Sequence, residues 1–292
     1  MRDYIIMTDS CCDLSQQEVE ELELTVLPLS FTIEGKTLLN TPDHADMSPE
    51  EFFAKIAAGA DCTTAAVNVG QFTDAMEKVL QEGKDILCVC FSSALSTTYQ
   101  SACIAAEDLR EKCPEAKILV IDSLSASRGQ GMLLYRAVRE RREKNLTIDE
   151  LDAYVRSIIQ SQCHWFIVDD LNHLKRGGRV SSTAALVGTM LGIKPVMHTD
   201  SEGRLTPVSK ARGTKAALRA LVDKVGEIGV EPEKNQPMLI CHANCAESVE
   251  YVKGLLKERF GVTDVRDDFI GPVIGAHTGC GTLGLFFVGT ER

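Results

Sequence analysis

Hydroxyl side chains gather in two short stretches of the sequence, where they could hold an anion. The segment FSSALSTTYQS at 91–101 places four serines and two threonines between an apolar run and an amphipathic pattern, and Thr63-Thr64 lies in a predicted loop before another helical pattern. Such hydroxyls cap a helix or, with the free N–H groups of its first turn, hold a carboxylate or phosphate. Ser96 occupies the position of an N-cap residue for the predicted helix at 96–112. Capping and anion binding both remain open for Ser96, its neighbour Ser93 and Thr64.

Two glycine-rich segments each carry a basic side chain. GPVIGAHTGCG at 271–281 places His277 and Thr278 in a predicted loop, and LKRGGR at 174–179 ends in Arg179 after two glycines. Glycine lets the backbone approach a ligand closely, and the forked guanidinium of arginine matches a carboxylate or phosphate. A structural histidine and an exposed turn are the alternative interpretations. From these residues alone we predict a protein that binds a small anionic ligand.

Several common catalytic and metal-binding motifs are absent or incomplete. GCGTLG at 279–284 matches the dinucleotide pattern G-x-G-x-x-G, but only eight residues follow it, too few for the helix that this motif requires. Neither G-x-S-x-G nor the P-loop pattern occurs, so no catalytic residue is assigned. The eleven cysteines form no pair of C-x-x-C clusters, which predicts reduced thiols and no metal site. A hydrolytic triad of Ser96, His277 and Asp122 is the enzymatic alternative, should the fold bring them together.

The composition is that of a globular protein. Hydrophobic residues make up 44% and charged residues 25% of the 292 positions, enough apolar material for two cores and too much for bulk disorder. The net charge of −11 argues against general nucleic-acid binding. No apolar run reaches the roughly 18 to 20 residues that span a bilayer, and the N-terminal stretch lacks a signal-peptide pattern. We therefore expect a cytoplasmic protein without an integral membrane segment.

The first half of the chain alternates short apolar runs with helical patterns. The runs at 4–7, 86–91 and 118–121 are each followed by a helical pattern, at 16–23, 96–112 and 125–144. This alternation predicts an α/β fold with a mainly parallel sheet. Polar residues follow each run, among them Asp9, Ser93 and Asp122, so they should meet at the carboxyl edge of the sheet, where ligands bind.

The second half has a different pattern. Thr147 and Glu150 form a capping box, which places a domain boundary near residue 150 and divides the chain into residues 1–150 and 151–292. Beyond it we predict strands at 166–168, 238–241, 269–274 and 283–288, a hairpin at 194–198 and 205–210, and helices at 214–228 and 246–259. These elements predict an α+β domain.

Charge is distributed unevenly between the halves. Residues 1–150 carry 14 cationic and 26 anionic side chains, whereas residues 151–292 carry 17 and 16. The stretches 171–199 and 203–222 contain lysine and arginine but no acid; the second includes Arg204, Lys210 and Arg212. They form either a solvated face or a docking surface.

The quoted motifs resemble those of the DegV family of bacterial fatty-acid-binding proteins, and the match covers nearly the whole chain. The resemblance rests on several segments together: MTDS at 7–10, Thr63-Thr64 with Gly70 and Phe72, SSALSTTYQS at 92–101, IDS at 121–123 with Gly129 and Gly131, LKRGGR at 174–179 and GAHTG at 275–279. It implies an N-terminal α/β domain, a C-terminal α+β domain, and a ligand site at their interface.

The resemblance also implies a function and a set of site residues. Members of the family present a bound fatty acid to a separate fatty acid kinase, which forms an acyl phosphate, and they need no cofactor. The family's carboxylate contacts fall on Thr64 and Ser96, its nearby polar positions on His277 and Arg179, and we add Ser93 and Thr278 as neighbours of these residues. The basic stretch with Arg204, Lys210 and Arg212 becomes a candidate surface for kinase docking.

This sequence departs from the family pattern at three places. The usual Thr-Ser-Gln-Pro run is Thr-Ala-Ala-Val here, with Ala65, Ala66 and Val67; the glycine after Leu-Ser is Thr97; and the proline after His-Thr-Gly is Cys280. The loss of one hydroxyl and one amide changes the expected network beside Thr64. A module that senses a lipid or small anion without serving a kinase is the non-enzymatic alternative.

Overall fold

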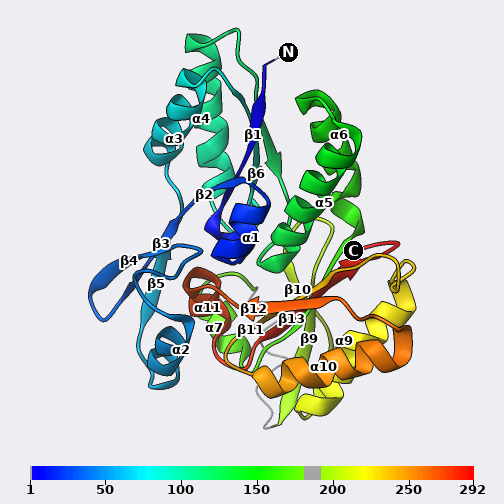
Figure 1. The fold of residues 1–292 in the computed structure, drawn as a ribbon. Coiled ribbons are helices and arrows are strands. Elements are labelled where there is room, and N and C mark those ends of the chain that lie inside the picture. Colours follow the sequence, from blue (N-terminus) through cyan, green and yellow to red (C-terminus); the bar gives the residue numbers. More distant parts are fainter. Residues whose placement is uncertain (1, 181–191) are drawn as a thin grey trace.

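The computed structural model describes residues 2–180 and 192–292, so the part of the cationic stretch at 181–191 lies outside the described residues. Figure 1 shows a parallel sheet flanked by helices, a mixed sheet, and a small sheet beside them. The first part of the chain forms β1 (Tyr4–Asp9), η1 (Ser10–Cys12), α1 (Gln16–Glu21), β2 (Leu24–Leu27), β3 (Leu29–Ile33), β4 (Lys36–Asn40), α2 (Pro49–Ala57), β5 (Cys62–Ala65), α3 (Val69–Gln81), β6 (Asp85–Cys90), α4 (Thr98–Lys112), β7 (Ile118–Asp122), α5 (Arg128–Lys144), α6 (Ile148–Ile158) and η2 (Ile159–Ser161).

The parallel sheet has the strand order β2-β1-β6-β7 and confirms the predicted alternation of strands and helices. Strand β6 is buried along its whole length, as expected for a parallel strand covered on both faces. One apolar cluster joins the sheet to α3 and α4, and a second joins it to α5 and α6. The helix α6 begins beside the predicted domain boundary and packs on this first sheet. The boundary near residue 150 stays a prediction.

The second part of the chain builds a six-stranded sheet with the order β10-β9-β8-β13-β11-β12, in which only β11 and β12 pair in parallel. The helices α9 and α10 cover one face, while α5 contacts β8, β11 and β13. The predicted class, α/β with a mainly parallel sheet followed by an α+β part, is confirmed. Its elements are β8 (Gln162–Ile167), α7 (Leu171–Arg176), β9 (Ile193–Thr199), β10 (Leu205–Arg212), α9 (Thr214–Ile228), β11 (Met238–His242), α10 (Ala246–Phe260), β12 (Val265–Phe269), α11 (Pro272–Thr278) and β13 (Leu283–Val288).

A third sheet, β4-β3-β5, is antiparallel and has no counterpart in the sequence prediction. It corrects the placement of Thr64, which lies in strand β5 opposite Phe31 rather than in a loop. Because β5 is only four residues long and alternates between half-buried and exposed positions, its sequence lacks the apolar signal of a strand. This small sheet rests on α11 and places Thr64 beside that helix.

The segment before the last strand also differs from the prediction. The expected strand at 269–274 is wrong: β12 ends at Phe269, and Pro272 occupies the first turn of helix α11. Proline suits that position because its missing N–H has no partner in the first turn anyway. His277 and Thr278 therefore lie in the last turn of a helix and not in a glycine-rich loop. A helix holds their side chains in a more defined direction.

Candidate functional site

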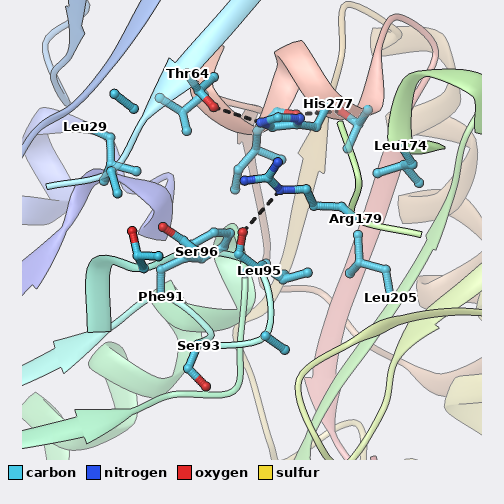
Figure 2. A pocket seen from close by; sticks show the side chains of 18 residues that line it. Leu29, Thr64, Phe91, Ser93, Leu95, Ser96, Leu174, Arg179, Leu205 and His277 are labelled. Carbon is cyan, nitrogen blue, oxygen red and sulfur yellow. Dashed lines mark hydrogen bonds between the residues drawn. The ribbon is translucent and has the colours of Figure 1, made fainter. Parts of the chain in front are cut away.

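A cavity of about 440 Å³, hereafter the main cavity, lies where the small sheet, the 92–97 loop, α11 and the segment after α7 meet. It brings together all six of the predicted site residues (Figure 2). Residues from both halves of the chain form its walls. The polar members of the lining are Thr64, Ser93, Ser96, Thr97, Arg179, His277 and Thr278, and the others are Leu29, Ala65, Ala66, Phe91, Ala94, Leu95, Ala126, Leu174, Leu205, Val273 and Ile274.

A hydrogen bond joins two residues that line the main cavity, Thr64 and His277. The Thr64 Oγ1 atom lies 2.9 Å from Nε2 of His277, as the dashed line in Figure 2 shows. Burial lowers the pKa of His277 to about 4, and the charge of Arg179 contributes to this effect. The imidazole is therefore neutral at neutral pH, and it can donate or accept one hydrogen bond through each nitrogen according to its tautomer.

Arg179 is the only formally charged residue in the described lining of the main cavity at neutral pH. Its Nε donates to the carbonyl oxygen of Leu95 at 3.2 Å, and Nη1 donates to the carbonyl of Gly177. The structure requires glycine at positions 177 and 178 for two different reasons. A Cβ on Gly177 would lie 2.3 Å from Nδ1 of His277, while Gly178 has a φ of +71°, in the left-handed region. The motif thus lets Arg179 and His277 approach each other.

The hydroxyl groups of the 92–97 loop have different environments. Ser96 Oγ accepts a hydrogen bond from the Thr98 N–H at 3.2 Å and lies 2.9 Å from Thr98 Oγ1, so it helps to start α4 while it lines the main cavity. The backbone N–H of Ser93 donates to Oδ1 of Asp122 at 3.1 Å. Figure 2 shows the Ser93 side chain directed away from His277. Ser96 is therefore the serine better placed to face a ligand.

Two aspartates, the buried Asp9 and the half-buried Asp122, hold the loops around the main cavity. Asp9 accepts hydrogen bonds from the N–H groups of Phe91 at 2.7 Å and Cys11 at 3.0 Å, and burial raises its pKa to about 6. The Oδ1 atom of Asp122 accepts from the N–H groups of Ser93 and Leu124. The polar strand ends do gather at the carboxyl edge, as predicted, but these carboxylates bind backbone rather than a ligand.

Asp13 is a structurally important residue that the sequence analysis missed. Its Oδ1 accepts from the N–H of Gly271 at 3.1 Å, and its Oδ2 accepts from Oγ of Ser127 at 2.5 Å. Gly271 and Ser127 immediately precede α11 and α5, so one carboxyl group links the starts of both helices. Burial raises the pKa of Asp13 to about 7. Nothing in the local sequence indicates a contact that spans 258 positions.

The enzymatic alternative lacks the geometry it requires. The His277 Nε2 atom bonds to Thr64, and Ser96 Oγ bonds to Thr98. Among residues 2–180 and 192–292, no hydrogen bond links Ser96, His277 and Asp122 into the chain that a triad needs. The same residues contain no group of three or more histidine, cysteine or acidic side chains arranged to hold a metal ion.

The departures from the family pattern fall on and around the main cavity. Ala65, Ala66 and Thr97 line it, whereas Val67 is fully buried in the adjoining apolar cluster. Cys280 lies outside it, with its thiol 3.5 Å from the carbonyl oxygen of Phe53. Burial raises the pKa of Cys280, which favours an unreactive thiol.

The three basic residues proposed for docking lie on one hairpin. Lys210 and Arg212 are exposed on β10, an edge strand of the six-stranded sheet, and Arg204 lies at the turn, paired with Glu202. A shallow groove at this turn includes Arg204 and shares Leu95 with the main cavity. Within the described ranges, no helix is both long and apolar enough to cross a bilayer.

A parallel sheet joined to a mixed sheet, with a partly polar cavity between the two halves of the chain, defines an α/β protein with a ligand-sized interior site. The chain belongs to the DegV family: the family model, described as an uncharacterised protein of that family, matches residues 4–290. A DegV domain-containing protein of Clostridium perfringens is 39% identical over 100% of this chain and 99% of its own.

Solved structures show the same fold along nearly the whole chain. A DegV family protein from Thermus thermophilus, described by its fatty acid binding, has a TM-score of 0.86 at 29% identity, covering 99% of this chain and 100% of its own. A DegV lipid-binding protein from Thermotoga maritima has a TM-score of 0.84 at 27% identity and covers 99% of both chains. The fold expected from the resemblance is confirmed.

Proposed function

We propose that this protein binds a long-chain fatty acid in the main cavity and presents its carboxylate to a fatty acid kinase. The observation that carries the proposal is the composition of the cavity: a single cation, Arg179, lies near neutral hydrogen-bonding groups in a lining that is otherwise mostly apolar. The volume of about 440 Å³ falls within the usual range for small-molecule sites. Relatives that bind fatty acids or lipids share the fold.

The polar residues provide donors for a carboxylate. Arg179 supplies charge, while Thr64, beside His277, and Ser96, beside Leu95, supply hydroxyl donors. His277 can donate to the ligand when the tautomer allows, because its neutral ring retains one N–H. Thr278 and Ser93 are weaker candidates, since the Thr278 hydroxyl donates to the Ile274 carbonyl and the Ser93 side chain points away.

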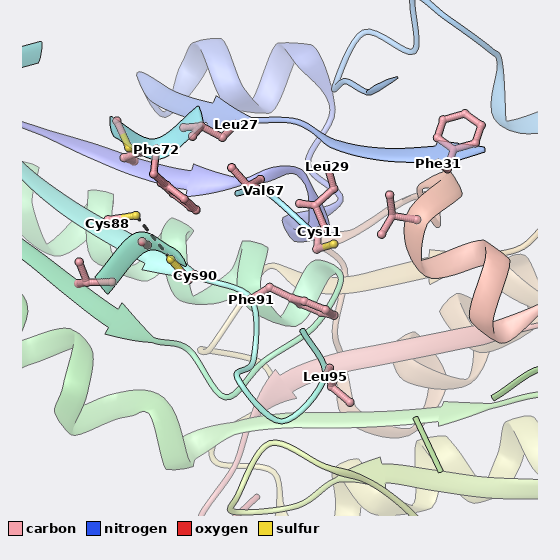
Figure 3. Packing of buried hydrophobic residues seen from close by; sticks show 14 of the residues in the cluster. Cys11, Leu27, Leu29, Phe31, Val67, Phe72, Cys88, Cys90, Phe91 and Leu95 are labelled. Atoms are coloured by element: carbon pink, nitrogen blue, oxygen red, sulfur yellow. Dashed lines mark hydrogen bonds between the residues drawn. The ribbon is translucent and has the colours of Figure 1, made fainter. Parts of the chain in front are cut away.

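The acyl tail would lie against the apolar part of the lining. Figure 3 shows Leu29, Phe91 and Leu95 within a buried cluster that continues to Val67 and Phe72. Each buried methylene contributes about 0.8 kcal/mol, so the tail would supply most of the affinity and the polar groups would set its direction. A tail bound in this region has to push apart side chains that pack together in the structure. The shape of the acyl chain should therefore affect binding.

The partner kinase would supply the chemistry. In the proposed reaction, a carboxylate oxygen bonds to the terminal phosphorus of a nucleoside triphosphate held by the kinase, and the diphosphate leaves. No residue of this chain acts as a catalyst, and no cofactor is required. The hairpin with Arg204, Lys210 and Arg212 is the candidate docking surface because its turn adjoins the main cavity. Eleven free thiols fit a reducing compartment, so we place this activity in the cytoplasm.

Native mass spectrometry of the purified protein tests the binding step. We expect one bound species per chain, which denaturing extraction identifies as a long-chain fatty acid. A bare chain mass that does not shift when hexadecanoate or cis-9-octadecenoate is added contradicts the proposal.

A second assay tests the partnership. The loaded protein is incubated with the fatty acid kinase from the same cell and ATP, and acyl phosphate is trapped with hydroxylamine as a hydroxamate. Hydroxamate formation that needs both proteins supports presentation to the kinase. Binding without hydroxamate favours the sensor alternative.

A further inference from the structure

A second cavity, of about 540 Å³, lies between helix α5 and the β11–β12 side of the six-stranded sheet. None of its lining residues lines the main cavity. We call it the arginine cleft because four arginines surround it, three from α5 and one from β12. Its lining is Leu22, Met132, Tyr135, Arg136, Val138, Arg139, Arg142, Glu143, Asn235, Gln236, Pro237, Leu239, Asp264, Arg266 and Val288.

The three arginines of α5 follow one another at intervals of three residues. Arg136, Arg139 and Arg142 therefore lie along the same face of the helix. Like charges at this spacing destabilise an isolated helix. Arg266 adds a fourth charge from the sheet, and its guanidinium lies 5.3 Å from the centre of the Tyr135 ring. Helix stability alone does not account for this ladder of cations on a protein whose net charge is −11.

Only part of this positive charge is neutralised within the described part of the chain. Arg142 pairs with Glu23 at 3.0 Å, and Arg266 pairs with Asp264 at 3.4 Å. Arg136 donates to the neutral hydroxyl of Ser161 at 3.1 Å. Arg139 has no ion pair or side-chain hydrogen bond with any described residue. Two guanidinium groups thus remain without an acidic partner, although exposed Glu143 stands on the rim.

The floor of the arginine cleft is apolar. Met132 and Leu239 are buried beneath the arginines, and Val138 and Val288 extend the same surface. Asn235 and Gln236 add amide groups to the polar mouth. A ligand that fits both parts must combine an anionic head with an apolar body. Two guanidinium groups without an acidic partner match the charge and the several acceptor oxygens of a phosphate dianion better than a single carboxylate does.

We propose that the arginine cleft binds a phosphate monoester that carries a compact apolar or aromatic group, with the phosphate between Arg136 and Arg139 and the apolar group on Met132 and Leu239. This site is independent of fatty-acid binding in the main cavity. A ligand there would contact α5 and the six-stranded sheet together, because the lining comes from both.

Titration calorimetry with 1-naphthyl phosphate as the probe tests this site in the full chain. We expect one probe to bind per chain, and binding to weaken at least about tenfold in the double variant Arg136→Gln/Arg139→Gln, since each change removes a charged hydrogen-bond donor. Lys144→Gln is the matched control: it removes one cation from the last residue of the same helix, outside the cleft. It should leave the dissociation constant within about twofold.

Further measurements separate this proposal from simpler explanations. The exposed single variant Arg139→Gln serves if the double variant does not fold, as judged by circular dichroism. Saturation with hexadecanoate should not displace the probe. The proposal is overturned by a wild-type protein that gives no binding at millimolar probe, by equal weakening in Lys144→Gln, or by displacement with hexadecanoate. Inorganic phosphate that binds as tightly as 1-naphthyl phosphate would remove the apolar part of the proposal.

Discussion

The two walls of the main cavity carry different chemistry. The wall from the first half of the chain, which we call the hydroxyl wall, presents Thr64 and Ser96, whereas the nitrogen wall from the second half presents Arg179 and His277. The hydroxyl wall is fixed by backbone: Thr64 lies in a paired strand, and Ser96 bonds to the start of α4. The nitrogen wall depends on close packing at Gly177. The formal charge therefore comes from the nitrogen wall alone, whereas both walls carry uncharged hydrogen-bonding groups, and the bond between Thr64 and His277 joins the two walls.

Removal of the charge from the nitrogen wall should have the largest effect. We expect Arg179→Met to weaken hexadecanoate binding roughly 10- to 100-fold, because a hydrogen bond to a charged group contributes about 1.5–3 kcal/mol. Isothermal titration calorimetry measures the change. Lys175→Met is the matched control, since Lys175 is exposed on α7 and does not line the main cavity. An unchanged dissociation constant in Arg179→Met would show that the nitrogen wall does not hold the carboxylate.

Loss of the hydroxyl wall should have a smaller effect. The double variant Thr64→Ala/Ser96→Ala is expected to lower affinity for hexadecanoate by about 5- to 30-fold, since two neutral hydrogen bonds contribute about 0.5–1 kcal/mol each. Thr63→Ala/Ser101→Ala deletes the same kinds of group from positions outside the lining. If both double variants bind like the wild type, the hydroxyl wall contributes only to the structure of its own strand and loop.

A methyl group at Gly177 should disturb the nitrogen wall without any change in its charge. The new Cβ would lie 2.3 Å from Nδ1 of His277, so the imidazole has to shift, which disturbs its hydrogen bond with Thr64. We expect Gly177→Ala to lower stability by about 1–3 kcal/mol, as other overpacked sites do, and to weaken binding only a few-fold. Thermal unfolding measures the first effect. Gly254→Ala on α10, where a Cβ meets nothing within 4 Å, should instead be neutral or stabilising.

The last predicted effect is a dependence of stability on pH. Because the pKa of His277 is lowered to about 4 in the folded protein, the unfolded chain binds a proton more readily between pH 4 and about 6.5. The stability that the neutral ring provides is therefore complete above about pH 6.5 and is lost as the pH falls toward 4.

This dependence can be isolated by comparison with His277→Gln. The stability difference between wild type and variant, measured by urea unfolding, should shift against the wild type as the pH falls from 7 to 4. The variant also controls for other titrating groups, such as buried Asp13, whose raised pKa of about 7 acts with the opposite sign. A constant difference across this range would mean that His277 keeps an ordinary pKa.

The parts of the fold that local sequence encodes were predictable. Apolar runs gave β1, β6 and β7, and the hairpin of β9 and β10 followed from a polar turn between two strand patterns. The small sheet was missed because β4 and β5 are short and partly exposed, so their pairing with β3 rather than their own pattern defines them. Tertiary contacts decide such strands.

The candidate site was predictable in its residues but not in its geometry. Motifs pointed to Thr64, Ser96, Arg179 and His277, and the structure brings all four to one cavity. Their secondary structure was predicted less well: the glycines around His277 suggested a loop, yet one of them, Gly275, lets α11 pack against two aromatic rings of α2. Their role in carboxylate binding stays a prediction.

The contact between Asp13 and Gly271 has a consequence for how the chain is made. Helix α11 packs on α2 and the small sheet, and Asp13 holds its first turn. During synthesis the ribosome releases these partners long before α11, because the N-terminal part of a chain emerges first. Phe52 and Phe53, which face Gly275 in the finished protein, are then left without that cover. These two aromatic rings thus stay without the cover of α11 until that helix has been made, and the main cavity closes only when its α11 wall is in place.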